Sequence, residues 1–129
     1  EKISNTYKNV VCLNQINDSN LLACYYTQAN ALLTLSRSES FGMTCAESLC
    51  CGTPVVGFCS GGPESISLPE YSFFTEYGKI DELEKVLPEV SRKFADQKKE
   101  ISQKAAQIYS SQRMADEYIQ LYKRIYKDS

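Results

Sequence analysis

The sequence predicts a single α/β domain in which a parallel sheet of about four strands is flanked by helices. Four short apolar runs have the length of buried strands, and they lie at residues 10–13, 31–35, 55–58 and 72–75. Helical patterns follow the first two runs and fill residues 81–127. Strands that alternate with helices form parallel sheets with right-handed crossovers. With 129 residues, the chain has room for one core.

Several residues mark the expected helix boundaries: Asp18 or Ser19, Asp81, Pro88, and Ser110 or Ser111. The aspartates and serines can cap a first turn, whereas Pro88 is expected to kink or end the helix that Asp81 begins. A further helical pattern covers residues 94–109. The last helix carries an apolar stripe, formed by Met114, Tyr118, Leu121, Tyr122 and Ile125. The same helix carries an aromatic stripe, Tyr118, Tyr122 and Tyr126, whose exposure to water would invite self-association.

Composition excludes several classes of function. The net charge of −2, with both signs interspersed, gives no field that would concentrate nucleic acid. No apolar run reaches the roughly 18 residues of a membrane span, and no signal-peptide pattern is present. We therefore expect a cytoplasmic protein, with peripheral association at the inner membrane face left open.

Cysteine usage indicates a reducing compartment. The six cysteines lie among apolar neighbours, which is typical of small core residues, and the chain has no histidine. A zinc site would need four thiolates from scattered elements. We expect no metal and no cofactor.

Residues 35–66 carry the pattern that indicates a ligand-binding or catalytic site. Glu39 and Glu47 flank a Phe-Gly turn, and a helical run then leads to the strand at residues 55–58, which is followed by Gly61 and Gly62. The order of elements is strand, glycine loop, helix, strand and glycine loop. Open α/β sheets build ligand crevices at strand ends in this way.

This stretch closely resembles the signature of family 4 glycosyltransferases, which are retaining nucleotide-sugar enzymes with the two-domain GT-B fold. The matching features are Ser36, Glu39, Phe41-Gly42, Glu47, CGTPVV at residues 51–56, and GGPE at residues 61–64. The resemblance continues weakly from about residue 10 to the C-terminus. It implies a Rossmann-like domain that binds a nucleotide diphosphate sugar without a metal. The family's turn reads Glu-Gly-Phe-Gly, and Ser40 replaces its first glycine here.

The resemblance assigns roles to individual residues. Glu47 would bind the two ribose hydroxyls, and Glu39 would meet the hydroxyls of the donor sugar as the catalytic-site carboxylate. The backbone of Ser40, Phe41, Gly42 and Met43 would complete that contact. The first amides of the helix, at Met43 and Thr44, can face the diphosphate, where the helix dipole favours negative charge.

Three features of this stretch also have plain structural interpretations. Glu39 can be an exposed loop glutamate, we expect the Phe41 ring to anchor its loop in the core, and we expect Thr53-Pro54 only to end a helix and open a buried strand.

Two further assignments have structural alternatives. Thr44 and Glu47 also fit a capping box, in which the glutamate only reaches back to the threonine N–H. Gly61 and Gly62 can serve sugar or acceptor access, or they can form a plain tight turn.

The resemblance also implies what the chain lacks. The family's Arg and Lys that hold the diphosphate precede the matching region, and residues 10–13 would correspond to the third strand of the donor domain. We therefore expect residues 1–129 to form a single, incomplete C-terminal domain, inactive alone. Its parent would transfer a hexose to a glycan or lipid-linked acceptor held by an N-terminal domain. A nucleotide-sugar 2-epimerase and a non-catalytic binding module are the alternatives.

Overall fold

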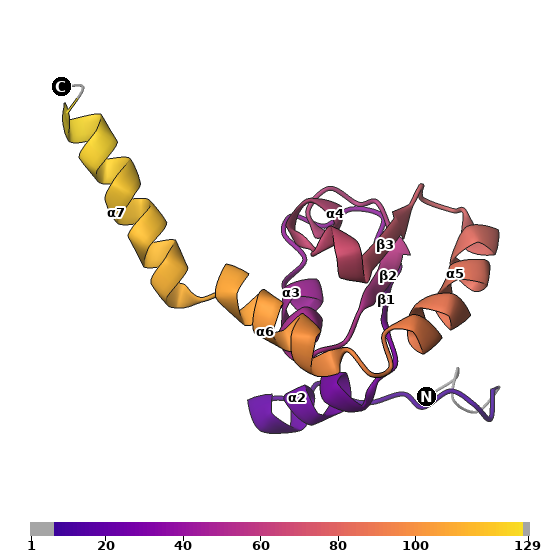
Figure 1. The fold of residues 1–129 in the computed structure, drawn as a ribbon. Coiled ribbons are helices and arrows are strands. Elements are labelled where there is room, and N and C mark those ends of the chain that lie inside the picture. Colours follow the sequence, from indigo (N-terminus) through magenta and orange to yellow (C-terminus); the bar gives the residue numbers. More distant parts are fainter. Residues whose placement is uncertain (1–6, 128–129) are drawn as a thin grey trace.

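The computed structural model describes residues 7–127 and contains one parallel sheet with the strand order β1-β2-β3 (Figure 1). β1 (Leu32–Thr34) pairs with β2 (Val55–Phe58), which pairs with β3 (Ser72–Thr75). Leu32 lies opposite Val55, and Val55 lies opposite Ser72. All four residues of β2 are buried. The uninterrupted run VVGF therefore forms the central strand, as expected of a strand covered on both faces.

The predicted strands at residues 55–58 and 72–75 are confirmed at those bounds, and the one at residues 31–35 shortens to Leu32–Thr34. The predicted strand at residues 10–13 is wrong. These residues belong to no strand, and Val11 is 79% exposed. An apolar run becomes a strand only where a neighbour pairs with its backbone N–H and C=O groups. The described sheet offers this segment no such neighbour.

Within residues 7–127, seven helical segments surround the strands: α2 (Ser19–Gln28), α3 (Met43–Cys50), α4 (Pro63–Ile66), η1 (Pro69–Tyr71), α5 (Ile80–Lys93), α6 (Lys98–Ile108) and α7 (Ser111–Lys127). Asp18 caps α2, as predicted, by accepting hydrogen bonds from the N–H groups of Asn20 and Leu21 at 2.8 and 3.3 Å.

Two helix predictions need correction. Asp81 lies in the first turn of α5 and is not its cap, and Pro88 lies inside α5 without ending it. Leu83 and Val90, on either side of the proline, are both buried, so packing holds both halves of the helix on the core. The pattern at residues 94–109 becomes a helix only from Lys98.

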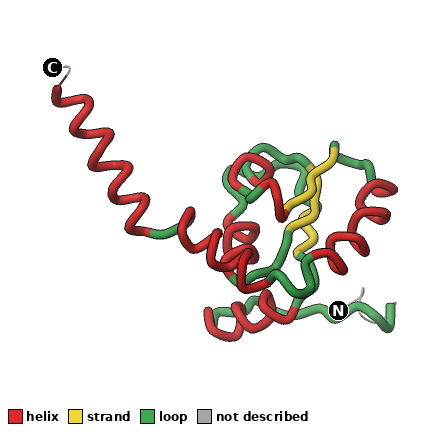
Figure 2. Tube along the Cα trace, in the orientation of Figure 1, coloured by secondary structure: helices red, strands yellow, loops and turns green. Residues whose placement is uncertain are grey.

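Helices cover both faces of the sheet. Figures 1 and 2 show α3 on one side of the strands and α5 on the other, with α6 and α2 packed beyond α3. The core is contributed by several elements, with Leu49 from α3, Val56 from β2, Leu83 from α5 and Ile101 from α6. α3 is therefore packed between the sheet and two other helices. This packing fixes the positions of the N–H groups and side chains in the first turns of α3.

The end of α2 is held by side chains from two distant segments. The hydroxyl of Thr53, a fully buried residue, donates hydrogen bonds to the carbonyl oxygens of Tyr26 and Ala29. The Lys98 ammonium donates to the carbonyls of Thr27 and Ala29, the latter at 2.6 Å. These bonds satisfy carbonyls that a helix end leaves without partners. They lock α2 against α3 and the start of β2.

α7 extends away from the body of the domain, and none of its residues is buried (Figure 1). Within the described part of the chain, no helix has both the length and the apolar character needed to cross a bilayer.

The prediction that the six cysteines are small core residues is confirmed only in part. Cys45 is buried, Cys50 and Cys51 are half-buried, and Cys12, Cys24 and Cys59 are exposed. All six are free thiols. The exposed ones follow from the elements that carry them, because Cys12 lies outside the sheet and α2 turns Cys24 to solvent.

Gly52, just after α3, lies close to the backbone at the start of α6. Its φ is +81°, and a Cβ there would lie 2.3 Å from the carbonyl oxygen of Lys98. Gly78 has a similar φ of +90° with no atom within 4 Å of its would-be Cβ. We predict that Gly78→Ala loses about 1 to 2 kcal/mol of unfolding free energy, from left-handed backbone strain. Gly52→Ala should lose about 1 to 3 kcal/mol more, from overpacking.

Denaturant unfolding followed by circular dichroism measures both values. Equal losses in the two variants would contradict the close packing of α6 on Gly52.

Candidate functional site

Two loops pair at the carboxyl ends of β1 and β2. Glu39 and Gly61 form a parallel bridge beyond the sheet. The Glu39 N–H donates to the Ser60 carbonyl and the Gly62 N–H donates to the Glu39 carbonyl, each at 2.9 Å. The loop after β1 is therefore tied by its backbone to the loop after β2. This is the edge at which open parallel sheets bind ligands.

Glycine is required where the loops touch. A Cβ on Gly62 would lie 2.6 Å from backbone atoms of Phe41. A Cβ on Gly42 would lie 2.9 Å from the Pro63 ring, and Gly42 has a φ of +92°, which L-residues with side chains rarely adopt. Gly62 thus acts in close packing against the first loop, and Gly61, at φ +113°, makes the turn.

Glu64 holds the second loop in shape. Its carboxylate accepts hydrogen bonds from the N–H groups of Ser60 and Gly61, at 3.0 and 2.8 Å. Burial acts to raise the pKa of Glu64, but the hydrogen bonds from the N–H groups of Ser60, Glu64 and Gly61 outweigh it, so the pKa lies below its ordinary value. Glu64 was not among the functional residues expected from the sequence. The feature of the sequence that could have indicated this role is a glutamate directly after Gly-Gly-Pro, where a helix begins.

The start of α3 has no side-chain cap. Gly42 is the N-cap and receives no side-chain hydrogen bond, and the next two residues, Met43 and Thr44, are exposed. The first N–H groups of a helix have no carbonyl partner within it. Here the Gly42 carbonyl accepts only from Cys45 and Ala46. Helix starts of this kind favour anions.

Glu47 lies one turn further along α3 and faces α2. Its carboxylate accepts a hydrogen bond from the Tyr26 hydroxyl at 3.3 Å, so the capping-box alternative does not describe its contacts. Burial first, and then the Glu47 carboxylate through its charge and hydrogen bond, raise the pKa of Tyr26 to about 12. Both residues line a cavity of about 220 Å³ between α2 and α3, together with Ser19, Leu22, Ala23, Cys50 and Cys51.

A second cavity, of about 470 Å³, lies between the first loop and the junction of α6 and α7. Phe41 and Met43 line one side of it, and Tyr109, Arg113 and Met114 line the other. Phe41 is 46% exposed, so the interpretation of this ring as a core anchor is wrong. The ring lines an open cavity instead, while the backbone of Phe41 lies close to Gly62.

The residues expected from the sequence thus fall into two groups. Glu39, Ser40, Gly42, Gly61 and Gly62 lie in the paired loops, and the Ser40 N–H donates to the Glu39 carboxylate at 3.1 Å. Glu47 lies apart from them, in the groove between α2 and α3. Tyr26 and Glu64 were missed. Residues 7–127 bring no three thiol or carboxylate side chains together as a metal site requires, and the expected absence of a metal stays a prediction.

The Tyr26–Glu47 contact makes a spectroscopic prediction. Because a nearby carboxylate disfavours the phenolate, Glu47→Gln should lower the pKa of Tyr26 from about 12 towards the ordinary value, leaving the part due to burial. NMR titration of the labelled tyrosine ring carbon measures it.

Tyr109 is the internal control, because burial and thiol neighbours, and not Glu47, raise its pKa to about 12. Its titration should be the same in the variant. An unchanged Tyr26 titration would contradict the contact.

Comparison with known proteins places this geometry in a family. The chain matches the family described as glycosyl transferases group 1 over residues 4–108. It is 50% identical, over 42 residues, to D-inositol 3-phosphate glycosyltransferase of Thermomonospora curvata, a stretch that covers 33% of this chain and 10% of that protein.

Among solved structures, sucrose-phosphate synthase from Thermosynechococcus elongatus superposes with a TM-score of 0.72 at 27% identity, over 99% of this chain and 33% of that one. The chain therefore spans about a third of that enzyme. The parallel sheet with helices on both faces is that of a GT-B glycosyltransferase domain. Because the family match covers residues 4–108 of 129, the chain belongs to the glycosyl transferases group 1 family.

Proposed function

We propose that this chain forms the donor side of a retaining glycosyltransferase, which moves a hexose from a nucleotide diphosphate sugar to a glycan or lipid-linked acceptor. One observation carries the proposal: the paired loops hold Glu39 beside the exposed start of α3, and Glu47 follows one turn later. A helical turn advances about 5 Å, so the first amides of α3 and the Glu47 carboxylate have the spacing needed to contact the diphosphate and the adjacent ribose of one nucleotide.

The diphosphate would lie at the start of α3. Breaking the bond between the anomeric carbon and the phosphate oxygen leaves negative charge on the diphosphate, and stabilising this charge is the main catalytic task. The amides of Met43 and Thr44, together with the helix dipole, would supply part of that stabilisation. The burial of α3 between the sheet and its neighbouring helices keeps these donors fixed before the charge develops.

The ribose would bind to Glu47. A carboxylate can accept hydrogen bonds from two vicinal hydroxyls while keeping a further contact, because its two oxygens carry about four acceptor sites. The Tyr26 hydroxyl occupies one site on Oε2 and restricts rotation of the carboxylate. Tyr26 would thus act as a positioning residue, and its own place is set by the Thr53 hydroxyl bound to the Tyr26 carbonyl.

The donor sugar would lie against the paired loops. Glu39 is half-buried and bonded to the Ser40 N–H, so its carboxylate is oriented by its own loop. We propose that it holds a hydroxyl of the transferred hexose, with the backbone from Ser40 to Met43 completing the contact. The cavity between Phe41, Met43 and the α6–α7 junction would admit the sugar or its acceptor, with Gly61 and Gly62 shaping the entrance.

We further propose that the reaction needs no metal or other cofactor. We also propose that it takes place in the cytoplasm or at the inner face of a membrane. The chain spans about a third of the solved relative, so the acceptor and the remaining diphosphate contacts would come from outside it. Sugar transfer by the chain alone is not expected, and its nucleotide affinity should be weak.

Weak nucleotide binding is still measurable by NMR titration of the isotope-labelled chain with a panel of nucleoside diphosphates. We predict shifts centred on the Met43 and Thr44 amides. Glu47→Ala should weaken binding by about 1.5 to 3 kcal/mol, the range for hydrogen bonds to charged groups. Glu39→Ala should leave binding of the free nucleotide unchanged, because its partner is the sugar.

The exposed Glu89 of α5 provides a matched control, since Glu89→Ala removes the same charge on another helix. Equal affinities for wild type and Glu47→Ala would rule out the ribose assignment. Shifts confined to other regions would rule out the proposed function.

A further inference from the structure

Glu64 binds one side of a peptide group in the loop after β2. Its Oε1 accepts from the Gly61 N–H at 2.8 Å and its Oε2 accepts from the Ser60 N–H at 3.0 Å, so both carboxylate oxygens are engaged. Burial acts to raise the pKa of Glu64, but hydrogen bonds from backbone N–H groups hold it below its ordinary value. The acceptor is therefore ionised at neutral pH, and such hydrogen bonds are roughly twice as strong as those between neutral groups.

Glu39 binds the other side of the same peptide group. The Gly61 N–H and the Ser60 carbonyl belong to one peptide unit, and this carbonyl accepts from the Glu39 N–H at 2.9 Å. A trans peptide is planar, so its N–H and C=O point in opposite directions. The unit between residues 60 and 61 therefore lies between the Glu64 side chain and the Glu39 backbone. Hydrogen bonds in such a chain polarise and strengthen one another.

The orientation of this peptide unit depends on Glu64. A flip of the unit rotates ψ of residue 60 and φ of residue 61, and glycine at position 61 tolerates φ of either sign. The Ser60 side chain adds no restraint by hydrogen bonding, because within residues 7–127 its hydroxyl oxygen is buried without a partner. A flipped unit would turn its carbonyl oxygen towards the Glu64 carboxylate, which the negative charge opposes.

We infer that Glu64 is a positioning residue for Glu39, which it holds in place through the peptide unit between residues 60 and 61. This role rests on the proposed function, in which the Glu39 carboxylate binds a hydroxyl of the transferred hexose. The Glu39 carbonyl also accepts from the Gly62 N–H at 2.9 Å, so the backbone of Glu39 is tied to the loop after β2 at both its N–H and its C=O. Its carboxylate accepts from the adjacent Ser40 N–H, so the direction of the side chain follows that backbone.

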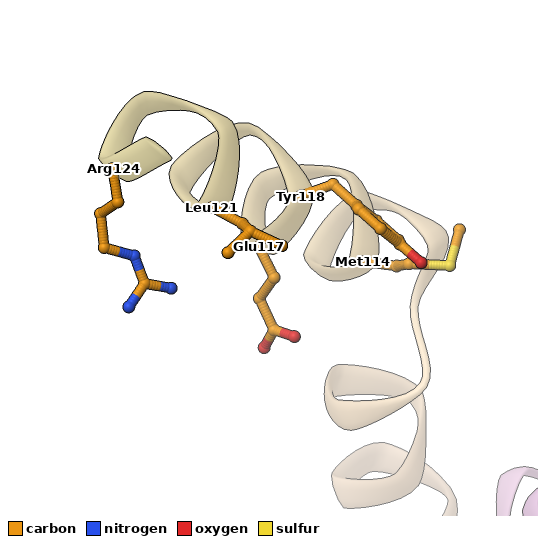
Figure 3. Close-up of a pocket in the computed structure, with 5 residues that line it drawn as sticks. All are labelled: Met114, Glu117, Tyr118, Leu121 and Arg124. Atoms are coloured by element: carbon orange, nitrogen blue, oxygen red, sulfur yellow. The ribbon is translucent and has the colours of Figure 1, made fainter. Parts of the chain in front are cut away.

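Glu117 of α7 shows what a glutamate without this role looks like. It lines a shallow cavity whose other lining residues are Met114, Tyr118, Leu121 and Arg124 (Figure 3). Its carboxylate accepts a hydrogen bond at 2.8 Å from Arg113, one turn away in the same helix. Such a pair joins two side chains on a helix surface. Glu64, in contrast, binds backbone groups that hold a second loop of the site.

Amide hydrogen exchange tests the link on the folded chain. Glu64→Ala should speed exchange of the Glu39 N–H about tenfold or more, because loss of the charged acceptor frees the peptide unit that receives this N–H. Glu64→Gln keeps the size of the side chain and one acceptor oxygen, so it should give a smaller increase. It decides the question if Glu64→Ala does not fold.

Two controls accompany the exchange measurement. The Leu32 N–H donates to the Pro54 carbonyl at 2.8 Å and should exchange at the wild-type rate in both variants. Glu89→Gln, which removes an exposed charge on α5, should leave the exchange of the Glu39 N–H unchanged. An unchanged rate at Glu39 in the Glu64 variants, or an equal rise at Leu32, would overturn the positioning role.

Donor binding separates positioning from a general structural effect. The probes for NMR titration are uridine, adenosine and guanosine diphosphate, together with the glucose and mannose esters of each. Glu64→Ala should keep wild-type affinity for the free nucleotide that binds best and should lose affinity for its sugar ester about as much as Glu39→Ala does. The double variant should lose no more than either single variant, since both changes remove the same contact.

The outcomes distinguish the positioning role from the proposed function. If Glu64→Ala weakens binding of the free nucleotide as much as binding of the sugar ester, its effect is general and the positioning role is overturned. If wild type binds none of the probes, the proposed function fails, and the exchange rate of the Glu39 N–H alone decides whether Glu64 holds Glu39.

Discussion

The direct backbone contact between the loops that follow β1 and β2 is the constraint on which the site depends. Two hydrogen bonds through Glu39 tie these loops together, and the contact is possible because Gly42 and Gly62 have no side chain at the closest approach. Glu64 then fixes the second loop through its amides. The start of α3 emerges from this arrangement with its first amides exposed. Because backbone groups join the two loops, the side chains on the solvent side of the loops remain available to a ligand.

A second set of contacts determines the other half of the site. Thr53 and Lys98 bind the last carbonyls of α2, and this anchors Tyr26 beside Glu47. Both anchoring residues come from segments distant from α2 in sequence. The Thr-Pro pair that opens β2 therefore does more than end a helix, because its hydroxyl sets the position of the groove that faces Glu47.

The sequence predicted the local features and missed those that depend on distant partners. The run at residues 55–58 was recognisable as a buried strand, and Asp18 as a cap, because each depends on its neighbours. Residues 10–13 have the same apolar character but no adjacent strand, and periodicity does not reveal whether a partner exists. The Tyr26–Glu47 contact spans 21 residues and was equally invisible. Spacing predicted that Glu39, Gly42 and Glu47 serve one site; in the structure Glu39 and Gly42 lie in the paired loops and Glu47 lies one turn along α3, where it faces α2.

In the proposed site, Glu47, oriented by Tyr26, binds the ribose of a nucleotide donor whose diphosphate lies at the start of α3. A comparison of ribose hydroxyls tests it most directly: the affinity of a nucleoside diphosphate is measured against that of its 2′,3′-dideoxy form, for wild type and for Glu47→Ala. We predict that wild type binds the ribose form about tenfold more tightly or better, as loss of a charged hydrogen bond implies, and that Glu47→Ala shows no preference. Equal affinity of wild type for the two nucleotides, or a preference that survives in Glu47→Ala, would contradict it.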